Sequence, residues 1–316
     1  MEKASQYRVR DYATTDFLKW NAFVAKAPNA TFLFHRDFME YHQDRFTDYS
    51  LIVEDDNDWV AVLPANIVDT IVYSHQGLTY GGLVVKPEMS GSEIPMIWDS
   101  IFLYLQANHI SKWIYKPILH FYSSNQEEVL DFHLNQKGKL FRKDLGMVIH
   151  FNEPFTVAKA KRKHHKKAHQ KGLFMQLEND LKPFWNEVLI PRLMEKYQAQ
   201  PVHTLTEIQY LKEKFPENIL QYSAYCEDQI VAGITLFVFK NGIKSQYGAT
   251  TLKGEETRAL DFLFVNLIEK YKKEFAFFDM GTVSSNDNKS INKGLFDQKK
   301  EYGCVAYEQK FYEFSL

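Results

Sequence analysis

A polar segment near the carboxyl end of the chain holds the side chains best suited to acid–base chemistry and to charge stabilisation. It covers residues 278–303 and reads FDMGTVSSNDNKSINKGLFDQKKEYG. Asp279 ends a run typical of a buried strand, a polar loop with Asn292 follows, and a helix-like turn leads to Lys299. Polar groups at the carboxyl end of a strand are well placed to line a cleft in an α/β layer, which predicts a site here. The alternative is structural: Asp279 caps the next turn and the asparagines only build the loop.

A second candidate is the basic run at 159–171, KAKRKHHKKAHQK, which contains seven Lys or Arg and three His. It lies between FNEPF, which resembles a hinge, and the strand-like GLFMQLE. One interpretation is a solvated helix, since almost no apolar residue anchors a face. The other is a site in which Lys163, Lys166 and Lys167 bind phosphates of a cofactor, a nucleotide-linked substrate or RNA.

Other familiar chemistry is not indicated. The sequence has no Walker loop, no Rossmann glycine fingerprint, no nucleophile elbow and no His-Glu-x-x-His motif. His165 and His169 are one helical turn apart, but the lysines beside them would repel a cation, so no metal site is predicted.

The elements that would position these residues form an internal repeat. Residues 50–77 align without a gap on residues 221–248, so that SHQG falls on SQYG, and both copies read as strand, acidic turn, strand, polar turn, strand. An amphipathic helix follows each copy, at 93–110 and at 257–275, and a short buried strand comes next, at 112–117 and at 275–281. The pattern predicts two related α/β halves.

Composition agrees with two folded domains. The chain has 316 residues, of which 45% are hydrophobic and 15% aromatic, and we expect domains at 1–152 and 153–316. The net charge of -2 gives no global reason to expect nucleic acid or an acidic membrane as partner. Cys226 and Cys304 have no metal-like spacing and are expected to be reduced thiols, with one disulfide between them as the alternative. With no signal peptide and no spanning segment in the sequence, we expect a soluble cytoplasmic protein whose oligomeric state is open.

The order of motifs resembles that of the FemAB-like acyltransferases, which are tandem N-acyltransferase domains of the GNAT superfamily. The resemblance covers residues 17–303 and is carried by these segments: WNAFVAKAPNATFLFHRDFMEYH, DDNDWVAVLPANIV, SHQGLTYGGLVV, the basic run, VAGITLFVF, ALDFLFVNLIEKY and FFDMGTVSSNDN with NKGLFDQKKEYG. It implies mixed sheets flanked by helices. SHQGLTYGG would be the central strand of the first half and SQYGAT the equivalent strand of the second.

The resemblance also implies a reaction. Members of this group move an acyl or aminoacyl unit onto an amine of a cell-envelope or saccharide precursor, from acyl-CoA or from aminoacyl-tRNA. The sequence has Gln298 where tRNA-using members carry an aromatic residue, and the long helical arm of cross-bridge enzymes has no counterpart. We therefore expect an acyl-CoA-type donor and an amino-sugar or envelope-polysaccharide acceptor. An aminoacyl-tRNA-dependent peptidoglycan ligase and a non-catalytic nucleotide- or RNA-binding protein remain the alternatives.

The resemblance assigns roles to four residues of the second half of the chain. Lys299, in QKKEYG, would stabilise the oxyanion or a phosphate, and Asp279 would orient the acceptor amine or accept its proton. Lys253 and Arg258, in TLKGEETRA, would bind a pyrophosphate beside two glutamates that oppose its binding.

The remaining candidates belong to the cleft and to the acceptor. His75 and Tyr80 of the first half and Tyr247 of the second would join Asn292 in the cleft, whereas His35 and Arg36 would contact the phosphates of a nucleotide-linked acceptor. For His75 the alternative is a hydrogen-bonded core histidine, and for Tyr80 and Tyr247 it is packing. His203, in QPVHTL, could also cap the helix that starts near Thr204.

Overall fold

The computed structural model describes residues 7–87, 89–123, 134, 137–284 and 290–316. The chain divides into two compact units, which we call unit 1 (residues 1–143 and 309–316) and unit 2 (residues 144–308). The sequence-based boundary at 152/153 differs from this division in two ways. The end of β9 (Lys139–His150) pairs with a strand of unit 2, and the end of β15 (Val305–Ser315) pairs with a strand of unit 1.

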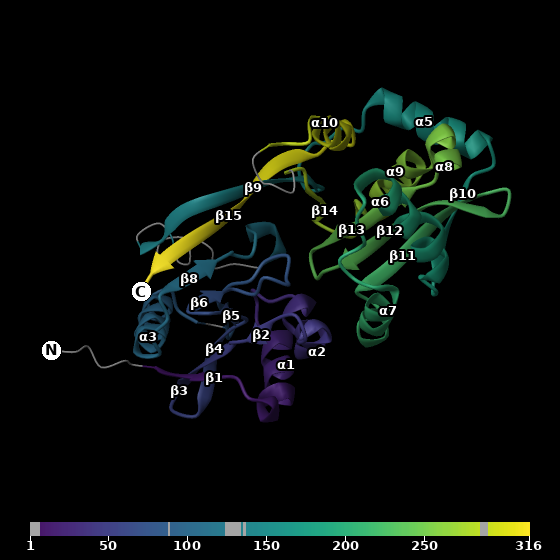
Figure 1. Ribbon diagram of the computed structural model, residues 1–316. Helices are drawn as coiled ribbons and strands as arrows, with labels where there is room; N and C mark the ends of the chain where they lie inside the picture. The colour runs from purple at the N-terminus through teal and green to yellow at the C-terminus, as the bar shows by residue number, and fades with distance from the viewer. Residues whose placement is uncertain (1–6, 88, 124–133, 135–136, 285–289) are drawn as a thin grey trace. The chain divides into compact units, whose positions relative to one another are not determined.

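Unit 1 contains two groups of strands (Figure 1). The first has the order β1-β3-β4-β7 and is antiparallel: β1 (Arg8–Asp11), β3 (Leu51–Asp55), β4 (Asp58–Leu63) and β7 (Val84–Val85). The second has the order β15-β8-β6-β5-β2, with β2 (Thr47–Asp48), β5 (Asn66–Val68), β6 (Ile71–Tyr73) and β8 (Lys112–Tyr115). In this group β6 and β8 are parallel.

The helices of unit 1 are α1 (Phe17–Lys26), α2 (Arg36–Met39) and α3 (Glu93–Ala107), with 3-10 turns at Thr14–Asp16, Phe32–Phe34, Glu40–His42 and His120–Tyr122. Helix α3 occupies most of the range predicted at 93–110. It buries Trp98 completely, and the Trp98 ring contacts Trp113 and Tyr115 of β8 at centroid distances of 4.9 and 5.0 Å. Burial of such large aromatic faces gives unit 1 a core of its own.

Unit 2 is built on one sheet with the order β10-β11-β12-β13-β14-β9. Its strands are β10 (Phe174–Glu178), β11 (Ile219–Cys226), β12 (Gln229–Val238), β13 (Gly242–Thr250) and β14 (Phe277–Thr282), together with the end of β9. Neighbouring strands are antiparallel except β13 and β14, which are parallel. The first five of the six residues of β14 are buried, as in a strand covered on both faces.

The helices of unit 2 are α5 (Lys159–Gln170), α6 (Ile190–Tyr197), α7 (Leu205–Lys214), α8 (Leu252–Thr257), α9 (Ala259–Tyr271) and α10 (Lys293–Glu301), with a π-helical segment, η5 (Phe184–Leu189). Helix α9 packs on the sheet over Ala232 and Ile234, while a Cβ on Gly233 would lie 2.2 Å from the Phe184 ring. Because successive strand residues face opposite sides, η5 covers the face opposite to α9.

The predicted duplication is confirmed at the level of elements. Each unit has an antiparallel strand pair, a third strand, a helix and a strand parallel to the third: β3, β4, β6, α3 and β8 in unit 1, and β11, β12, β13, α9 and β14 in unit 2. The basic run forms helix α5, which packs against α9. In the described part of the chain, no helix is long and apolar enough to cross a membrane.

One prediction about the repeat was wrong. SQYGAT belongs to β13, but in unit 1 the equivalent strand ends at Tyr73, so SHQGLTYGG is a loop. The chain turns away from the sheet at two residues with a left-handed or positive-φ backbone, His75 with φ 59° and Gly82 with φ 115°. At Gly81, a Cβ would lie 2.0 Å from the carbonyl oxygen of Ser74, so only glycine fits this turn.

Candidate functional site

The predicted carboxyl-terminal residues meet in unit 2, where the parallel strands β13 and β14 stop pairing. Their paired residues are Gly242 with Phe277, Ile243 with Phe278 and, last, Lys244 with Asp279. Beyond that pair β13 continues beside β12, and β14 beside β9. The last pair therefore presents two oppositely charged side chains on one face, at the point where the strands diverge.

Asp279 is the centre of this cluster. Its side chain has no exposed surface, and Oδ1 accepts hydrogen bonds from the Gly281 amide at 2.7 Å and from the Tyr307 hydroxyl at 3.0 Å. The Lys244 Nζ lies 3.8 Å from Oδ2. A buried carboxylate requires such partners, because an uncompensated charge in a low-dielectric interior is costly.

Lys299 joins the cluster from α10. The Asn292 side chain caps this helix by accepting a hydrogen bond from the Leu295 amide at 3.0 Å. The Lys299 Nζ donates to the carbonyl oxygens of Gly281 at 3.0 Å and Thr282 at 2.9 Å. Gly281 has φ 76°, a conformation suited to glycine, and this turn aims its carbonyl oxygen at the ammonium group.

Burial perturbs Lys299. It lowers the pKa of the ammonium group to about 8, with a further lowering from Lys244 that the Asp279 charge opposes. At neutral pH the group therefore remains mostly charged, while its side chain is only 9% exposed. A charged donor in a low-dielectric site can stabilise negative charge that develops on a reacting group. We call Asp279, Lys244, Lys299 and Tyr307 the polar centre of unit 2.

Tyr247 lies on the same face of the sheet as Lys244, because their β12 partners, Thr235 and Phe237, are two residues apart. The Tyr247 hydroxyl is 2.5 Å from His203 Nδ1 and accepts a hydrogen bond from the His203 amide at 3.1 Å. Burial raises the pKa of Tyr247 to about 12, so the phenol stays protonated and can donate to Nδ1. These two hydrogen bonds with His203 thus fix the position of the Tyr247 hydroxyl group.

His203 is not the cap of the next helix. Thr204 caps α7, because its side chain accepts a hydrogen bond from the Glu207 amide at 3.2 Å. The sequence did not predict Lys244 and Tyr307 of the polar centre, or the hydrogen bond between His203 and Tyr247. β13 and β14 are far apart in the sequence, so no local pattern indicates that Lys244 lies beside Asp279. That position follows from the register of β13 on β14.

The first-half candidates lie in unit 1. Tyr80 is fully buried, donates to Thr31 Oγ1 at 3.1 Å and packs on Phe34, which agrees with the packing alternative. His75 is 4% exposed and has rings of His42 and Phe46 at centroid distances of 5.3 and 5.6 Å. The structure brings Lys299, Asp279, Asn292 and Tyr247 into one unit, and the catalytic role of His75 stays a prediction.

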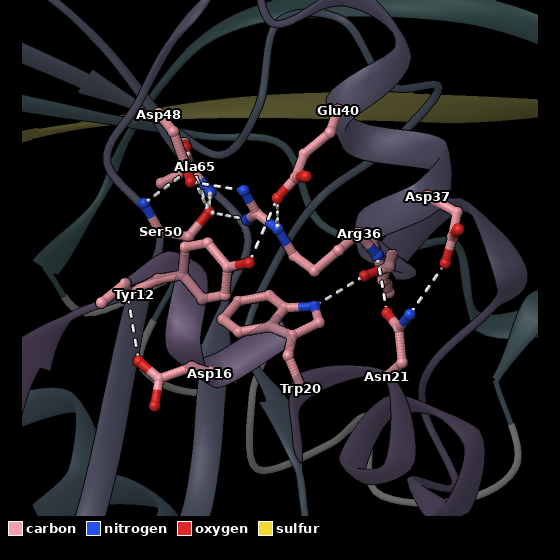
Figure 2. A network of polar contacts seen from close by, with 12 residues as sticks. Tyr12, Asp16, Trp20, Asn21, Arg36, Asp37, Glu40, Asp48, Ser50 and Ala65 are labelled. Atoms are coloured by element: carbon pink, nitrogen blue, oxygen red, sulfur yellow. Dashed lines mark hydrogen bonds and ion pairs between the residues drawn. The ribbon is translucent and has the colours of Figure 1, made fainter. Parts of the chain in front are cut away.

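Arg36 and His35 also lie in unit 1. The Arg36 guanidinium donates to Glu40 at 2.8 Å, to Asp48 at 2.5 Å and to Ser50 at 3.1 Å, and it stacks 3.8 Å from the centroid of the Tyr12 ring (Figure 2). With its side chain 3% exposed, Arg36 connects α2 to β2 through Asp48 and to Ser50, which immediately precedes β3. Burial lowers the pKa of the neighbouring His35. The geometry therefore gives Arg36 a structural role, and the contact of His35 and Arg36 with the phosphates of a nucleotide-linked acceptor stays a prediction.

The basic residues of helix α5 form two sets, of which one is paired with Asp261 and the other is exposed to solvent. Lys161 Nζ is 2.8 Å from Asp261 Oδ1, His164 Nδ1 is 2.8 Å from Asp261 Oδ2, and Tyr302 donates a short hydrogen bond to the same carboxylate. Burial alone would raise the pKa of Asp261, but Lys161 and Tyr302 outweigh it and lower that pKa. The second set includes Lys163, Lys166 and Lys167, which are exposed.

The segment proposed to bind a pyrophosphate is helical. Thr251 caps α8 by accepting from the Gly254 amide at 3.1 Å, and the Glu255 amide donates to the Thr251 carbonyl oxygen at 2.9 Å. Lys253 pairs with Glu227 at 2.7 Å, and Arg258 has φ 61° between α8 and α9.

Glu255 pairs with Arg192 and, at 3.0 Å, with Lys196. One of the two glutamates that would oppose a pyrophosphate is therefore neutralised, while Glu256 is exposed, and amides of this segment are already hydrogen-bonded within α8. Residues 285–289 of the polar loop lie outside the described residues.

Comparison with solved structures identifies the fold. FemX matches with a TM-score of 0.67 and 11% identity over 98% of this chain and 97% of that chain. L-PGS from Bacillus licheniformis matches with a TM-score of 0.61 and 13% identity over 97% of this chain and 93% of that chain. A tandem GNAT protein from the clavulanic acid biosynthesis pathway matches with a TM-score of 0.50 and 9% identity over 98% of both chains.

No protein-family model and no curated protein matches the sequence. The chain has the tandem GNAT-like fold of the FemX type, and the predicted fold is confirmed.

Proposed function

We propose that this protein is an acyltransferase, which moves an acyl or aminoacyl unit onto the amine of a second substrate. The observation that carries the proposal is the polar centre of unit 2, in which buried Lys299 and Lys244 flank the carboxylate of Asp279 where two parallel strands diverge. The tandem GNAT-like fold supports it as an analogy, since one fold can host several chemistries.

The reaction assigns a task to each group. The amine nitrogen attacks the donor's carbonyl carbon, the C–N bond forms, and the carbonyl oxygen gains negative charge until the leaving group departs with its electron pair. We propose that Lys299 directs a remaining N–H of its ammonium group at that oxygen, or at a donor phosphate. The amine proton passes to the leaving group or to water, because a strong base is not required for this step.

The structure supports a positioning role for Asp279 rather than contact with the acceptor. Its carboxylate has no exposed surface and is engaged by Tyr307 and the Gly281 amide. It therefore balances the two ammonium charges and orients the Tyr307 hydroxyl. The acceptor amine would belong to an amino sugar or to an envelope-polysaccharide precursor, as the resemblance implies.

We propose an acyl-CoA-type donor as the first candidate and aminoacyl-tRNA as the second. The ion pairs of Glu255 favour the first, because they neutralise one of the two glutamates that would oppose a pyrophosphate beside α8. The hydrogen-bonded amides of α8 and the exposed lysines of α5 favour the second, because a tRNA needs cations and no pyrophosphate loop.

The test is a transfer assay on the full chain. Acyl-CoAs are followed by thiol release and charged tRNAs by loss of the aminoacyl ester, each with and without amino-sugar acceptors. The variant Lys299→Met removes the ammonium group, while Lys300→Met changes the exposed neighbour on the same helix.

We expect Lys299→Met to lower turnover about 100-fold or more, and Lys300→Met to retain it. Activity with one donor class assigns the donor. Equal activity in the two variants would refute the site, and absence of transfer with both classes would favour the non-catalytic alternative.

A further inference from the structure

Unit 1 contains a pocket of about 400 Å³ that lies outside the polar centre of unit 2. Its wall is formed by residues from β6 and the loop after it, from β8 and the chain just beyond it, and from the unit 1 parts of β9 and β15. The volume is within the range of pockets that hold a small-molecule ligand, roughly 300–1,000 Å³.

The pocket occupies the position in unit 1 that the polar centre occupies in unit 2. Strands β6 and β8 are parallel over three residue pairs, and the last pair is Tyr73 with Ile114. Both residues line the pocket. The corresponding last pair in unit 2 is Lys244 with Asp279. Unit 1 therefore opens at the same point of the repeat, but without the carboxylate.

Two cations lie over an aromatic ring in the lining of the pocket. The Arg142 guanidinium carbon lies 4.4 Å from the centroid of the Phe311 ring, and Lys116 Nζ lies 5.2 Å from the same centroid. Phe141 is 48% exposed beside them. Among the described residues that line the pocket are two cations, Lys116 and Arg142, and no Asp or Glu.

The lining also includes a polar atom that is buried without a hydrogen-bond partner. His75 is 4% exposed, and its Nδ1 has no hydrogen-bond partner in unit 1 as described. Its backbone has φ 59°, which costs free energy in a residue other than glycine and is often found at ligand sites. The Gln76 amide fixes the loop by donating to Asn66 Oδ1 at 2.7 Å.

We propose that this pocket binds a small ligand in which a phosphate or carboxylate is attached to a planar ring. Lys116 and Arg142 bind the anionic group, the ring packs on Phe141 and Phe311, and the His75 imidazole supplies a neutral hydrogen-bonding group. The assignment goes beyond the transfer reaction, because it concerns binding to unit 1 and not the chemistry of unit 2.

The experiment measures binding to the full chain by isothermal titration calorimetry. The probes are phenyl phosphate and benzoate, with inorganic phosphate and benzyl alcohol as the partial probes that carry only the anion or only the ring. Arg142→Gln removes a charge from the pocket. Lys139→Gln removes a matched charge from the same strand, at an exposed residue that does not line the pocket.

We expect phenyl phosphate or benzoate to bind, and the one that binds identifies the anion as phosphate or carboxylate. Arg142→Gln should weaken binding about tenfold or more, since a charge-assisted hydrogen bond is lost, and Lys139→Gln should not. His75→Asn tests the contribution of the imidazole, because asparagine tolerates the left-handed backbone. Circular dichroism and melting curves establish that each variant is folded.

Three results would overturn the proposal: no binding of either full probe, equal binding of benzyl alcohol, or equal weakening by Lys139→Gln. The test needs no transfer activity. If Arg142→Gln weakens probe binding but the protein shows no transfer activity, the proposed function is refuted and the pocket is not. If the protein shows transfer that depends on Lys299 but Arg142→Gln binds the probe as the wild type does, the pocket is refuted and the proposed function is not.

Discussion

Acid should destabilise unit 1 through His75. Burial lowers the pKa of this imidazole to about 3 from its ordinary value of 6.5, with a further lowering from His42 and Arg36 and an opposing effect of Asp48. The imidazole is therefore neutral in the folded state across the range in which an unfolded histidine takes up a proton. Unfolding binds a proton between pH 6.5 and 3, so the free energy of unfolding must fall as the pH is lowered through that range.

The magnitude follows from the two pKa values. At pH 5 the unfolded state gains RT ln(1 + 10^1.5), which is about 2 kcal/mol, while protonation of the folded state is negligible. Near pH 8 the same contribution is close to zero. Because His75 is only 4% exposed, solvent screening does little to reduce this figure.

Urea unfolding at pH 8 and pH 5, followed by tryptophan fluorescence, measures the effect. Four of the five tryptophans belong to unit 1, so the signal reports mainly on that unit. The variant His75→Asn keeps a residue that tolerates φ 59° but cannot titrate. It should lose about 2 kcal/mol less than the wild type over this pH range. An equal loss in the two proteins would refute the argument, since the titration would then belong to other groups.

Three further outcomes follow from the buried charges. Turnover should fall as the pH rises through about 8, because the Lys299 ammonium group, whose pKa is lowered to about 8, loses its proton there. The control variant Lys300→Met should keep the wild-type pH profile. A wild-type profile that is flat to pH 10 would contradict the role of the ammonium group. Arg36→Met should lower the free energy of unfolding of unit 1 by about 3 kcal/mol in the same urea assay, because Glu40 and Asp48 lose their cation; unchanged stability would mean that the ion pairs contribute little. Asp261→Asn should destabilise unit 2 by about 3 kcal/mol through its buried lysine partner, measured by circular dichroism, while the exposed Lys163→Ala costs under about 0.5 kcal/mol; equal effects would exclude a special role for the buried pair.

Much of the fold could be predicted from the sequence because the repeat and the helical periodicity are local patterns. The helix at 257–275 corresponds to α9 and the strand at 275–281 to β14. The failure at SHQGLTYGG has an equally local cause. Serine, histidine and glycine are compatible with either a strand or a turn, and the Ser74 hydroxyl accepts a hydrogen bond from the Lys116 amide at 2.7 Å, a contact between residues far apart in the sequence.

The sites were less predictable, because they depend on such distant contacts. Lys299 and Asp279 share one short segment, so their association was foreseen, but Lys244 enters through strand register alone. Lys161 is one of seven basic residues in its run and only its burial against Asp261 separates it from its exposed neighbours. Composition describes that run correctly as basic and cannot identify which lysine is buried.

The two halves differ most where their parallel strands diverge, and that difference bears on how tasks are divided between them. In unit 2 the last pair is Lys244 with Asp279, a buried ion pair that a nearby ammonium group, Lys299, extends. Maintaining three charges away from water is costly, and such clusters persist where the charges act on a reacting group. In unit 1 the last pair is Tyr73 with Ile114, which has no charge to maintain, and the cations of the pocket line its wall instead. A pocket of that kind suits recognition of a ligand, whereas the buried cluster suits the stabilisation of charge that appears only during reaction. On this argument, substitutions in the unit 1 pocket should change the affinity for the ligand of that pocket, while substitutions of Lys244 or Lys299 should change the rate of the transfer step at saturating substrate.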